Sequence, residues 1–306
     1  MSSLSRIHIL AYCFLCLVWG STWLAMRYVV HDVPPFKAAA IRFLVAGTVL
    51  LIWALFRRIS MPKAGAQWNA TLVLSLTMIT LPYGFLFWAA QFVNSSTIAV
   101  LYSSLPLTVS LLTPLMTGRK VPRPAVFAMV LAFGGMLILF YVEQTASRKS
   151  LIGGLCVLIA MLLSAWSSVY AKKRLQDVDA LVSTGLQLTL GSIGLLWATW
   201  ALESQARTSW TRPAITGLLF LITFGSSAAF VVYYWLLQHM QAYQISTISL
   251  VIPVMAVLEG SLIGGEHVPL LMVVAMLVVL GSVGAVLFAE SHGDGLISVR
   301  SEEVQG

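Results

Sequence analysis

The sequence predicts an all-α membrane protein with ten transmembrane helices, arranged as two inverted five-helix repeats. Three observations lead to this fold. Apolar residues make up 59% of the 306-residue chain and charged residues only 9%, whereas about 25% of the residues in an ordinary soluble domain are charged. Apolar runs of about twenty residues, the length that crosses a bilayer, follow one another from end to end. The chain also resembles itself at a fixed separation of 147 residues.

The first apolar run follows Arg6 and continues past Trp19 and Trp23 without a small-residue cleavage site. We therefore expect a first spanning helix here and not a signal peptide. Short charged connections separate the later runs, and none could hold a soluble domain. The ten predicted spans are 7–28, 36–56, 70–92, 96–117, 124–142, 151–171, 181–202, 213–238, 243–263 and 268–289.

The internal repeat is carried by rare residue types that recur at one ungapped separation. The matched pairs include Trp19 and Trp166, Trp53 and Trp200, Trp88 and Trp235, Gln91 and Gln238, Pro106 and Pro253, and Gly134 and Gly281. Tryptophan is rare, so several such pairs at the same separation are hard to attribute to chance. The sequence predicts a first repeat at 1–146, a second repeat at 147–290 and a polar tail at 291–306.

The orientation of the two repeats is predicted by charge. Each repeat holds five spans, so the second must enter the membrane from the opposite side. Equivalent loops have exchanged their basic residues: Arg119-Lys120 corresponds to Glu266-His267, and Lys172-Lys173 corresponds to uncharged Ala25-Met26. Lys and Arg favour cytoplasmic loops. We therefore expect a multi-pass protein of the bacterial inner membrane with both termini cytoplasmic and the loop at 264–268 external.

Inverted repeats are the usual architecture of secondary transporters, whose substrate site lies near the midplane between the repeats. Trp19 and Trp23 share a helix face, and Trp166 and Tyr170 repeat that spacing in the second half. We predict that these four rings, with Tyr102, bind the substrate by stacking on a planar solute. The alternative is that they fill helix–helix contacts or face lipid.

Two charged residues, Arg42 and Glu259, lie more than one helical turn inside predicted spans, where an unpaired charge costs several kcal/mol. Arg42 and Glu259 lie about 9 Å and about 8 Å from the predicted external helix ends. We predict that they form an ion pair that closes the outer side of the path. A proton on Glu259 would release that pair, which makes protons a candidate coupling ion. Alternatively, Arg42 binds helix carbonyls or a substrate carboxylate while Glu259 faces an aqueous vestibule.

Two further pairs are candidates for gating. Gln91 and Gln238 retain a polar group at both repeat positions and could close hydrogen bonds across the gates, or cap helix ends. Pro106 and Pro253 each remove a backbone hydrogen bond, so a kink is expected once in each half. These kinks suit hinges, although static kinks are an equal alternative.

Each half of the chain contains a set of short motifs. They are Trp19-Gly20-Ser21-Thr22-Trp23, Arg27, Pro34-Pro35, Arg42-Phe43-Leu44 and Ala46-Gly47 in the first half, and Pro253, Ala256-Val257 and Gly264-Gly265-Glu266 in the second. In these residues the sequence resembles the EamA family of the drug/metabolite transporter (DMT) superfamily. The resemblance covers nearly the whole chain and implies a ten-helix carrier that exports amino acids or other small metabolites. Glu259 departs from it, because the family usually has an apolar or small residue at that position.

The leading function is therefore secondary transport of small organic solutes by alternating access, in the direction of export. A carrier or exchanger for phosphorylated or nucleotide-linked solutes is the alternative, but such cargo needs several Lys or Arg in the cavity. A membrane receptor or assembly protein without transport is a different class. An intramembrane enzyme is not expected, because the spans offer no catalytic constellation.

Partners other than the solute and membrane lipid are not expected. The net charge of +7 sits in loops as a topology signal, and no basic face suggests nucleic acid. Cys13, Cys16 and Cys156 lie in apolar runs without nearby His or carboxylate, so we expect no metal site and no cofactor. The sequence leaves the oligomeric state open.

Overall fold

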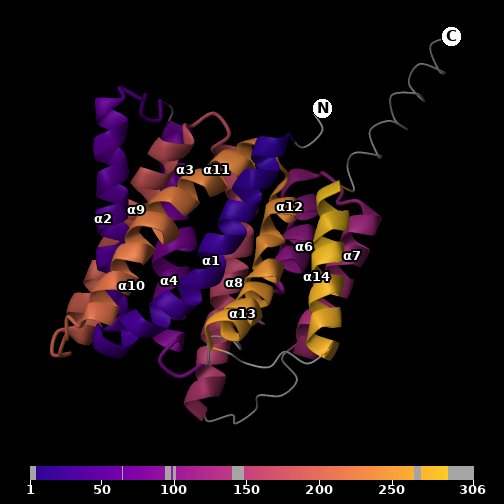
Figure 1. Ribbon diagram of the computed structural model, residues 1–306. Helices are drawn as coiled ribbons and strands as arrows, with labels where there is room; N and C mark the ends of the chain where they lie inside the picture. Colours follow the sequence, from indigo (N-terminus) through magenta and orange to yellow (C-terminus); the bar gives the residue numbers. More distant parts are fainter. Residues whose placement is uncertain are drawn as a thin grey trace.

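The computed structural model describes residues 5–63, 65–93, 98, 101–139, 148–264 and 270–288, and every regular element in these ranges is a helix (Figure 1). The elements of the first half are α1 (Arg6–Asp32), α2 (Pro35–Phe56), α3 (Gly65–Leu74), η1 (Ser75–Thr80), α4 (Leu81–Ala89), α6 (Leu105–Thr117) and α7 (Arg123–Leu139). Those of the second half are α8 (Arg148–Arg174), α9 (Ala180–Glu203), α10 (Arg212–Ile222), η2 (Thr223–Ala228), α11 (Ala229–His239), α12 (Ala242–Ser246), α13 (Ile248–Gly264) and α14 (Leu270–Phe288). The all-α prediction is confirmed.

The predicted spans correspond to ten helical segments of the described residues. Six continuous helices are long and apolar enough to cross a membrane: Arg6–Asp32, Pro35–Phe56, Gly65–Ala89, Leu151–Arg174, Ala180–Glu203 and Arg212–His239. Shorter apolar helices at Leu105–Thr117, Arg123–Gly135, Ala242–Met255 and Met276–Leu287 overlap the other four. The first turn of α1 and the last turn of α14 lie at the same end of the helix bundle (Figure 1).

Two predicted spans are broken where hydropathy is continuous. The ninth span divides at Thr247, between α12 and α13, and the fourth has a turn at Ser103 and Ser104 before α6. The hydroxyl of Thr247 donates to the Gln244 carbonyl, and that of Ser104 donates to the Leu101 carbonyl. Such hydroxyls compete with the backbone N–H groups of the helix for its carbonyls. A hydropathy profile does not detect this competition.

Two further helices contain a wide π-helical turn. In the segment Gly65–Ala89 it is η1, and in the segment Arg212–His239 it is η2. A π-turn interrupts the regular i→i−4 ladder of hydrogen bonds and often marks a functional site. The sequence reasoning did not predict either turn.

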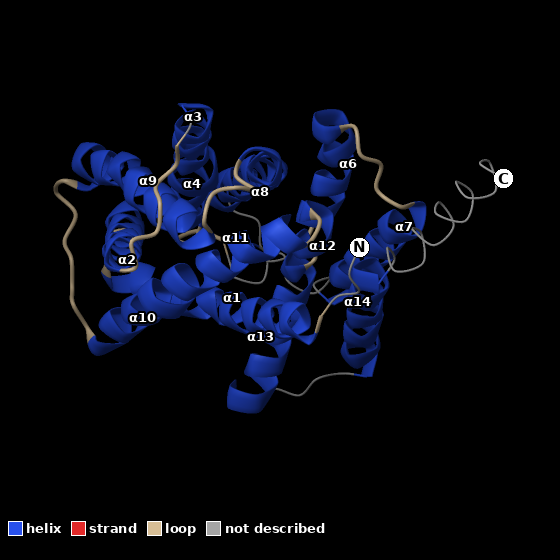
Figure 2. Cartoon of the chain, turned by 90° about the horizontal axis from the view of Figure 1, so that it is seen from above, coloured by secondary structure: helices blue, strands red, loops and turns tan. Residues whose placement is uncertain are grey.

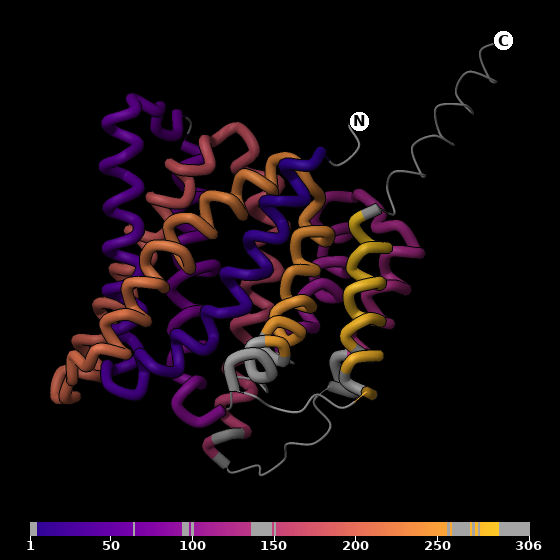
Figure 3. Tube along the Cα trace, viewed as in Figure 1, coloured from indigo at the N-terminus to yellow at the C-terminus, as the bar shows by residue number. Residues whose placement is uncertain are grey.

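Helices of the first half pack mainly against helices of the second. α2 lies along α9, and α7 lies along α14 (Figure 2). α1 packs against α10, α11 and α13, whereas α8 packs against α4, η1 and α6; Figure 3 traces these crossings along the chain. Glycine permits the closest of these contacts, because a Cβ on Gly47 would lie 2.6 Å from the backbone nitrogen of Thr189.

The outer surface of the bundle is apolar. Leu115, Leu270 and Trp200 are 81%, 78% and 73% exposed. Leu15 and Phe230, by contrast, are almost fully buried between helices. Apolar exposure over many helices marks a surface that contacts lipid and not water. Both the lipid-facing and the buried faces of the helices are apolar. Hydropathy therefore located the spans but did not show which face of each helix is buried.

Candidate functional site

The interior of the bundle holds a buried cation. Arg42 lies in the first half of α2 and is 2% exposed. Its Nε donates to Ser226 Oγ over 2.7 Å, and its Nη2 donates to the Gly225 carbonyl over 3.0 Å. No carboxylate among the described side chains lies within ion-pair distance of it. A guanidinium carries five N–H donors, so these two bonds leave three of them for another acceptor.

The π-turn η2 supplies both partners of Arg42. The Gly225 carbonyl also accepts a hydrogen bond of 3.3 Å from Trp19 Nε1. A side chain at Gly225 would not fit, because a Cβ there would lie 2.9 Å from Thr22 Cγ2 and 3.3 Å from Arg42 Nη2. The glycine therefore allows the guanidinium and the indole to reach the same carbonyl.

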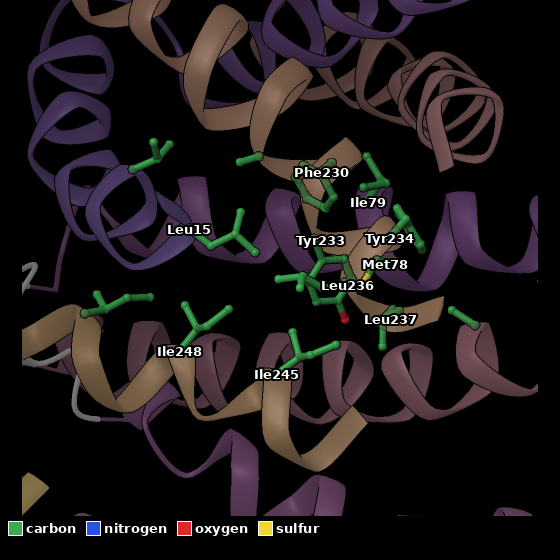
Figure 4. Close-up of a cluster of buried hydrophobic side chains, with 14 of the residues drawn as sticks. Leu15, Met78, Ile79, Phe230, Tyr233, Tyr234, Leu236, Leu237, Ile245 and Ile248 are labelled. Atoms are coloured by element: carbon green, nitrogen blue, oxygen red, sulfur yellow. The ribbon is translucent and has the colours of Figure 1, made fainter. Parts of the chain in front are cut away.

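Aromatic rings surround the cation, and we call Trp19, Arg42, Tyr83, Phe230 and Tyr233 the central cluster. The guanidinium carbon lies 5.3 Å from the ring centre of Tyr83, within cation–π distance. The ring centres of Trp19 and Tyr233 are 5.5 Å apart, and those of Tyr83 and Phe230 are 6.1 Å apart. These rings come from α1, α4 and α11, and Figure 4 shows Phe230 and Tyr233 among the buried side chains around them.

A line of hydroxyl groups on α8 extends the cluster toward Tyr102. Tyr102 donates to Ser164 Oγ over 2.7 Å, and Ser168 Oγ lies 2.7 Å from the Tyr233 hydroxyl. Trp23 meets Tyr102 with ring centres 6.1 Å apart, and its buried indole Nε1 has no hydrogen-bond partner. An unpaired buried donor is costly. Arg42 and Trp23 are therefore two buried side chains that retain unused hydrogen-bond donors.

The structure does not bring the predicted aromatic quartet together. Trp166 and Tyr170 stack on each other with ring centres 4.7 Å apart, and no described ring contact joins them to Trp19 or Trp23. Ser164 and Ser168 of α8 contact Tyr102 and Tyr233. Trp166 and Tyr170 each follow one of these serines by two residues, which turns a side chain by about 200° around the helix axis. Trp166 and Tyr170 therefore lie on the other side of α8.

The predicted gating residues are spread over the bundle. Gln91 donates to the Trp88 carbonyl one turn back, and Gln238 donates to the Val178 carbonyl beyond the end of α8 over 2.7 Å. Pro106 lies in the first turn of α6 just after the break, whereas Pro253 lies inside α13. Their roles as gates or hinges stay predictions.

The side chain of Glu259, one partner of the predicted ion pair, lies outside the part of the chain that the structure describes. The Arg42–Glu259 pair and proton coupling through Glu259 therefore stay predictions. The described hydrogen-bond partners of Arg42 are the Ser226 hydroxyl and the Gly225 carbonyl of η2. This agrees with the alternative that the guanidinium binds a helix carbonyl.

Sequence reasoning missed Tyr83, Phe230 and Tyr233. Tyr83 and Phe230 are 147 residues apart, so the comparison that revealed the repeat also contained this aromatic pair. No comparable signal marked Tyr233. No group of three potential metal ligands was found where the structure describes the chain.

A family model of EamA-like transporters matches residues 6–141 and 151–288. The chain belongs to the EamA-like transporter family. The transporter YoaV of Bacillus subtilis, named as uncharacterized, is 26% identical over 86% of this chain and 90% of its own length. YedA, an uncharacterized inner membrane transporter of Escherichia coli, is 28% identical over 90% of each chain.

A solved crystal structure shares the fold of this EamA chain. It superposes with a TM-score of 0.76 at 17% identity and covers 93% of this chain and 99% of its own. The family, its transporter relatives and the apolar helices make this protein a multi-pass membrane transporter that works in lipid on a small-molecule substrate.

Proposed function

We propose that this EamA protein exports amino acids or related small carboxylates across the bacterial inner membrane by alternating access. The observation that carries the proposal is Arg42, a buried cation without a described carboxylate partner, held among aromatic rings. A carboxylate matches the planar guanidinium and can accept two parallel N–H bonds from it. The rings of Trp19 and Tyr233 would then contact the rest of the solute.

The number of cations at the site disfavours phosphorylated cargo. Among the described residues that are buried, Arg42 is the charged one. A phosphate monoester carries about two negative charges at pH 7 and would leave one unbalanced in the membrane interior. A single carboxylate balances Arg42, and an amino group could be held by aromatic faces and hydroxyls such as Tyr102.

Inverted repeats are a common architecture of alternating-access carriers, and we propose that residues 1–146 and 147–290 are such repeats with a cytoplasmic tail at 291–306. The pairing of helices supports this, because α2 with α9 and α7 with α14 are counterparts at the separation of 147 residues. The two π-turns also occupy nearly equivalent positions. Tyr83 and Phe230, which are counterparts, meet at the centre.

The proposed topology predicts that the connection between α9 and α10 is external and that between α6 and α7 is cytoplasmic. In a background without native cysteines, Gln205→Cys should react with an impermeant thiol reagent in intact cells. Lys120→Cys should react after lysis only. Labelling of Lys120→Cys in intact cells, with Gln205→Cys protected, would reverse the topology.

The proposed function is tested with purified protein in liposomes loaded with unlabelled solute. We expect counterflow of a labelled amino acid such as leucine, with little counterflow of leucinamide, because the amide lacks the charge that Arg42 would bind. Equal counterflow of leucine and leucinamide would refute the carboxylate site while leaving a transporter. Failure of every amino acid and simple carboxylate in a broad panel, with counterflow of a sugar phosphate, would refute the substrate class.

A further inference from the structure

The two ends of the helix bundle differ at positions that are equivalent in the two halves. Gln91 and Gln238 are 147 residues apart and lie at the ends of α4 and α11. The ring of His239 contacts that of His8 in the first turn of α1, so Gln238 lies where α1 begins. Gln91 instead lines a pocket with Arg27. His8 and Arg27 are about 28 Å apart along α1 at about 1.5 Å per residue, so the two glutamines lie at opposite ends of the bundle.

The end that holds Gln238 is closed. Gln238 Nε2 donates to the Val178 carbonyl, in the connection between α8 and α9, over 2.7 Å. Lys172 Nζ of α8 donates to the Leu237 carbonyl of α11. These residues line a cavity of about 10 Å³, and a single water molecule needs about 10–15 Å³. Two hydrogen bonds and close packing therefore join α11 to α8 and to the connection that follows it.

The end that holds Gln91 is open. At the separation of 147 residues, the counterpart of the Val178 carbonyl is the carbonyl of His31. Gln91 does not reach it and donates to the Trp88 carbonyl of its own helix. Gln91 and His31 both line a groove of about 960 Å³ between α4 and α9, and Gln91 also lines a pocket of about 190 Å³ beside Arg27. Two groups whose counterparts are bonded to each other therefore face open space.

The residues around the two glutamines also differ. Lys172, which closes the Gln238 end, corresponds to Ala25, which has no side-chain donor. Tyr234 donates to Gln187 between α11 and α9, and its counterpart is Phe87, which cannot donate. The Gln238 end therefore has more hydrogen bonds that hold it closed, which favours the arrangement seen in this structure. The glutamine contact is one that both ends can make.

We propose that Lys172 and Gln238 form one gate of the solute path, the Gln238 gate. The matching contact at the other end, the Gln91 gate, joins Gln91 to the His31 carbonyl and is open in this structure. Inverted repeats exchange conformations during alternating access. When the Gln238 gate opens, Gln91 turns from the Trp88 carbonyl to that of His31, and the groove between α4 and α9 closes. This inference rests on the inverted repeats of the proposed function but not on the identity of the solute.

The test compares thiol reactivity at two counterpart positions. Phe36 lines the open groove, whereas Ser183, its counterpart, lines the closed cavity and is 1% exposed. The parent protein has Cys13, Cys16 and Cys156 replaced by serine and is purified in detergent, where a maleimide reaches both ends. In this parent, Phe36→Cys should react at least about tenfold faster than Ser183→Cys, because thiol reactivity follows access.

The rate for Ser183→Cys divided by that for Phe36→Cys measures the balance between the two arrangements. Gln238→Ala should raise this ratio about fivefold, which corresponds to about 1 kcal/mol, the usual net contribution of one hydrogen bond. Adding Lys172→Met should raise it by about tenfold or more. In this double variant Phe36→Cys should itself react more slowly than in the parent. If Gln238→Ala does not fold, Lys172→Met alone should change the ratio in the same direction.

Two further variants separate a gate from local packing. Gln176→Ala is the matched control, because Gln176 lines the same closed cavity without a described hydrogen bond; the ratio should stay within about twofold of the parent. Added to the double variant, Gln91→Ala should lower the ratio about fivefold, because it removes the hydrogen bond proposed for the exchanged arrangement.

A faster reaction of Ser183→Cys without slowing of Phe36→Cys in the double variant would overturn the proposal, because the contacts would then belong to local packing. An unchanged ratio in both Gln238→Ala and Lys172→Met would overturn it as well. The measurement uses no solute, so its outcome is distinct from that of the transport assay. Reciprocal labelling together with failure of amino-acid counterflow would support the gates and refute the proposed substrate class.

Discussion

Arg42→Gln is expected to lower kcat/KM for amino-acid counterflow by about a hundredfold. Truncating one partner of a buried, hydrogen-bonded charge pair costs about 2–5 kcal/mol, and each 1.4 kcal/mol is about tenfold. Arg42→Lys should lose about tenfold, because lysine retains the charge but not the planar pair of donors. Counterflow in liposomes at matched protein density measures both effects.

The controls separate solute binding from folding, because Arg42 also joins α2 to η2. Arg57→Gln removes a charge just beyond the end of the same helix and should leave transport within twofold of the parent. Ser226→Ala removes one acceptor of Arg42 and should have a few-fold effect. A thermal shift induced by leucine should disappear in Arg42→Gln while its elution on gel filtration is unchanged. Transport by Arg42→Gln within twofold of the parent would show that the cation does not bind the solute.

The second large effect is expected from Gly47→Ala. A Cβ at Gly47 would lie 2.4 Å from Thr189 Oγ1, 2.6 Å from the Thr189 nitrogen and 2.9 Å from the Gly185 carbonyl. Two of these are backbone atoms of α9, so the helices themselves must move apart. Overpacking costs about 1–3 kcal/mol and occasionally more. We expect about 3 kcal/mol, or a Tm lower by about 10 °C in detergent.

Alanine substitutions at two other glycines should give smaller losses of stability. Gly194→Ala would meet the side chain of Thr80 at 2.4 Å, so part of the clash can be relieved by rotation about one side-chain bond. Gly134→Ala meets nothing within 4 Å. The expected order of destabilisation is therefore Gly47→Ala, then Gly194→Ala, then Gly134→Ala with little change. Equal Tm values for the three variants would contradict the close packing of α2 on α9.

The contacts of Arg42 suggest how solute binding could be linked to helix movement. Arg42 belongs to the first half of the chain, whereas Gly225 and Ser226 belong to the second. A solute carboxylate that replaced both the Gly225 carbonyl and the Ser226 hydroxyl would release η2 from α2. Trp19 of α1 donates to the same Gly225 carbonyl, so a movement of η2 would also change its contact with α1. We expect Ser226→Ala to change the rate of counterflow more than the affinity for solute.

Several features of this protein could be predicted without a structure. The few charged residues and the long apolar runs predicted a helical membrane protein with many spans, because so few charged residues cannot cover the surface of a water-soluble protein. Arg42 could be selected because a charge inside a span is too costly to be retained without a partner. The transporter family could be recognised from short motifs around Trp19 and Arg42, and the family comparison confirms it.

The partners of each residue were decided by the tertiary structure. A helix that is apolar on all sides carries no periodic signal of which face is buried, so the spacing of Trp166 and Tyr170 could not reveal that they lie opposite the serines of α8. The acceptors of Arg42 are more than 180 residues away on a π-turn that hydropathy does not detect. The groove of about 960 Å³ lined by residues of α4 and α9 likewise exists only where two helices distant in the sequence enclose it. Composition determines that such a chain folds in lipid and not in water, but the rotation and depth of each helix depend on contacts with its neighbours.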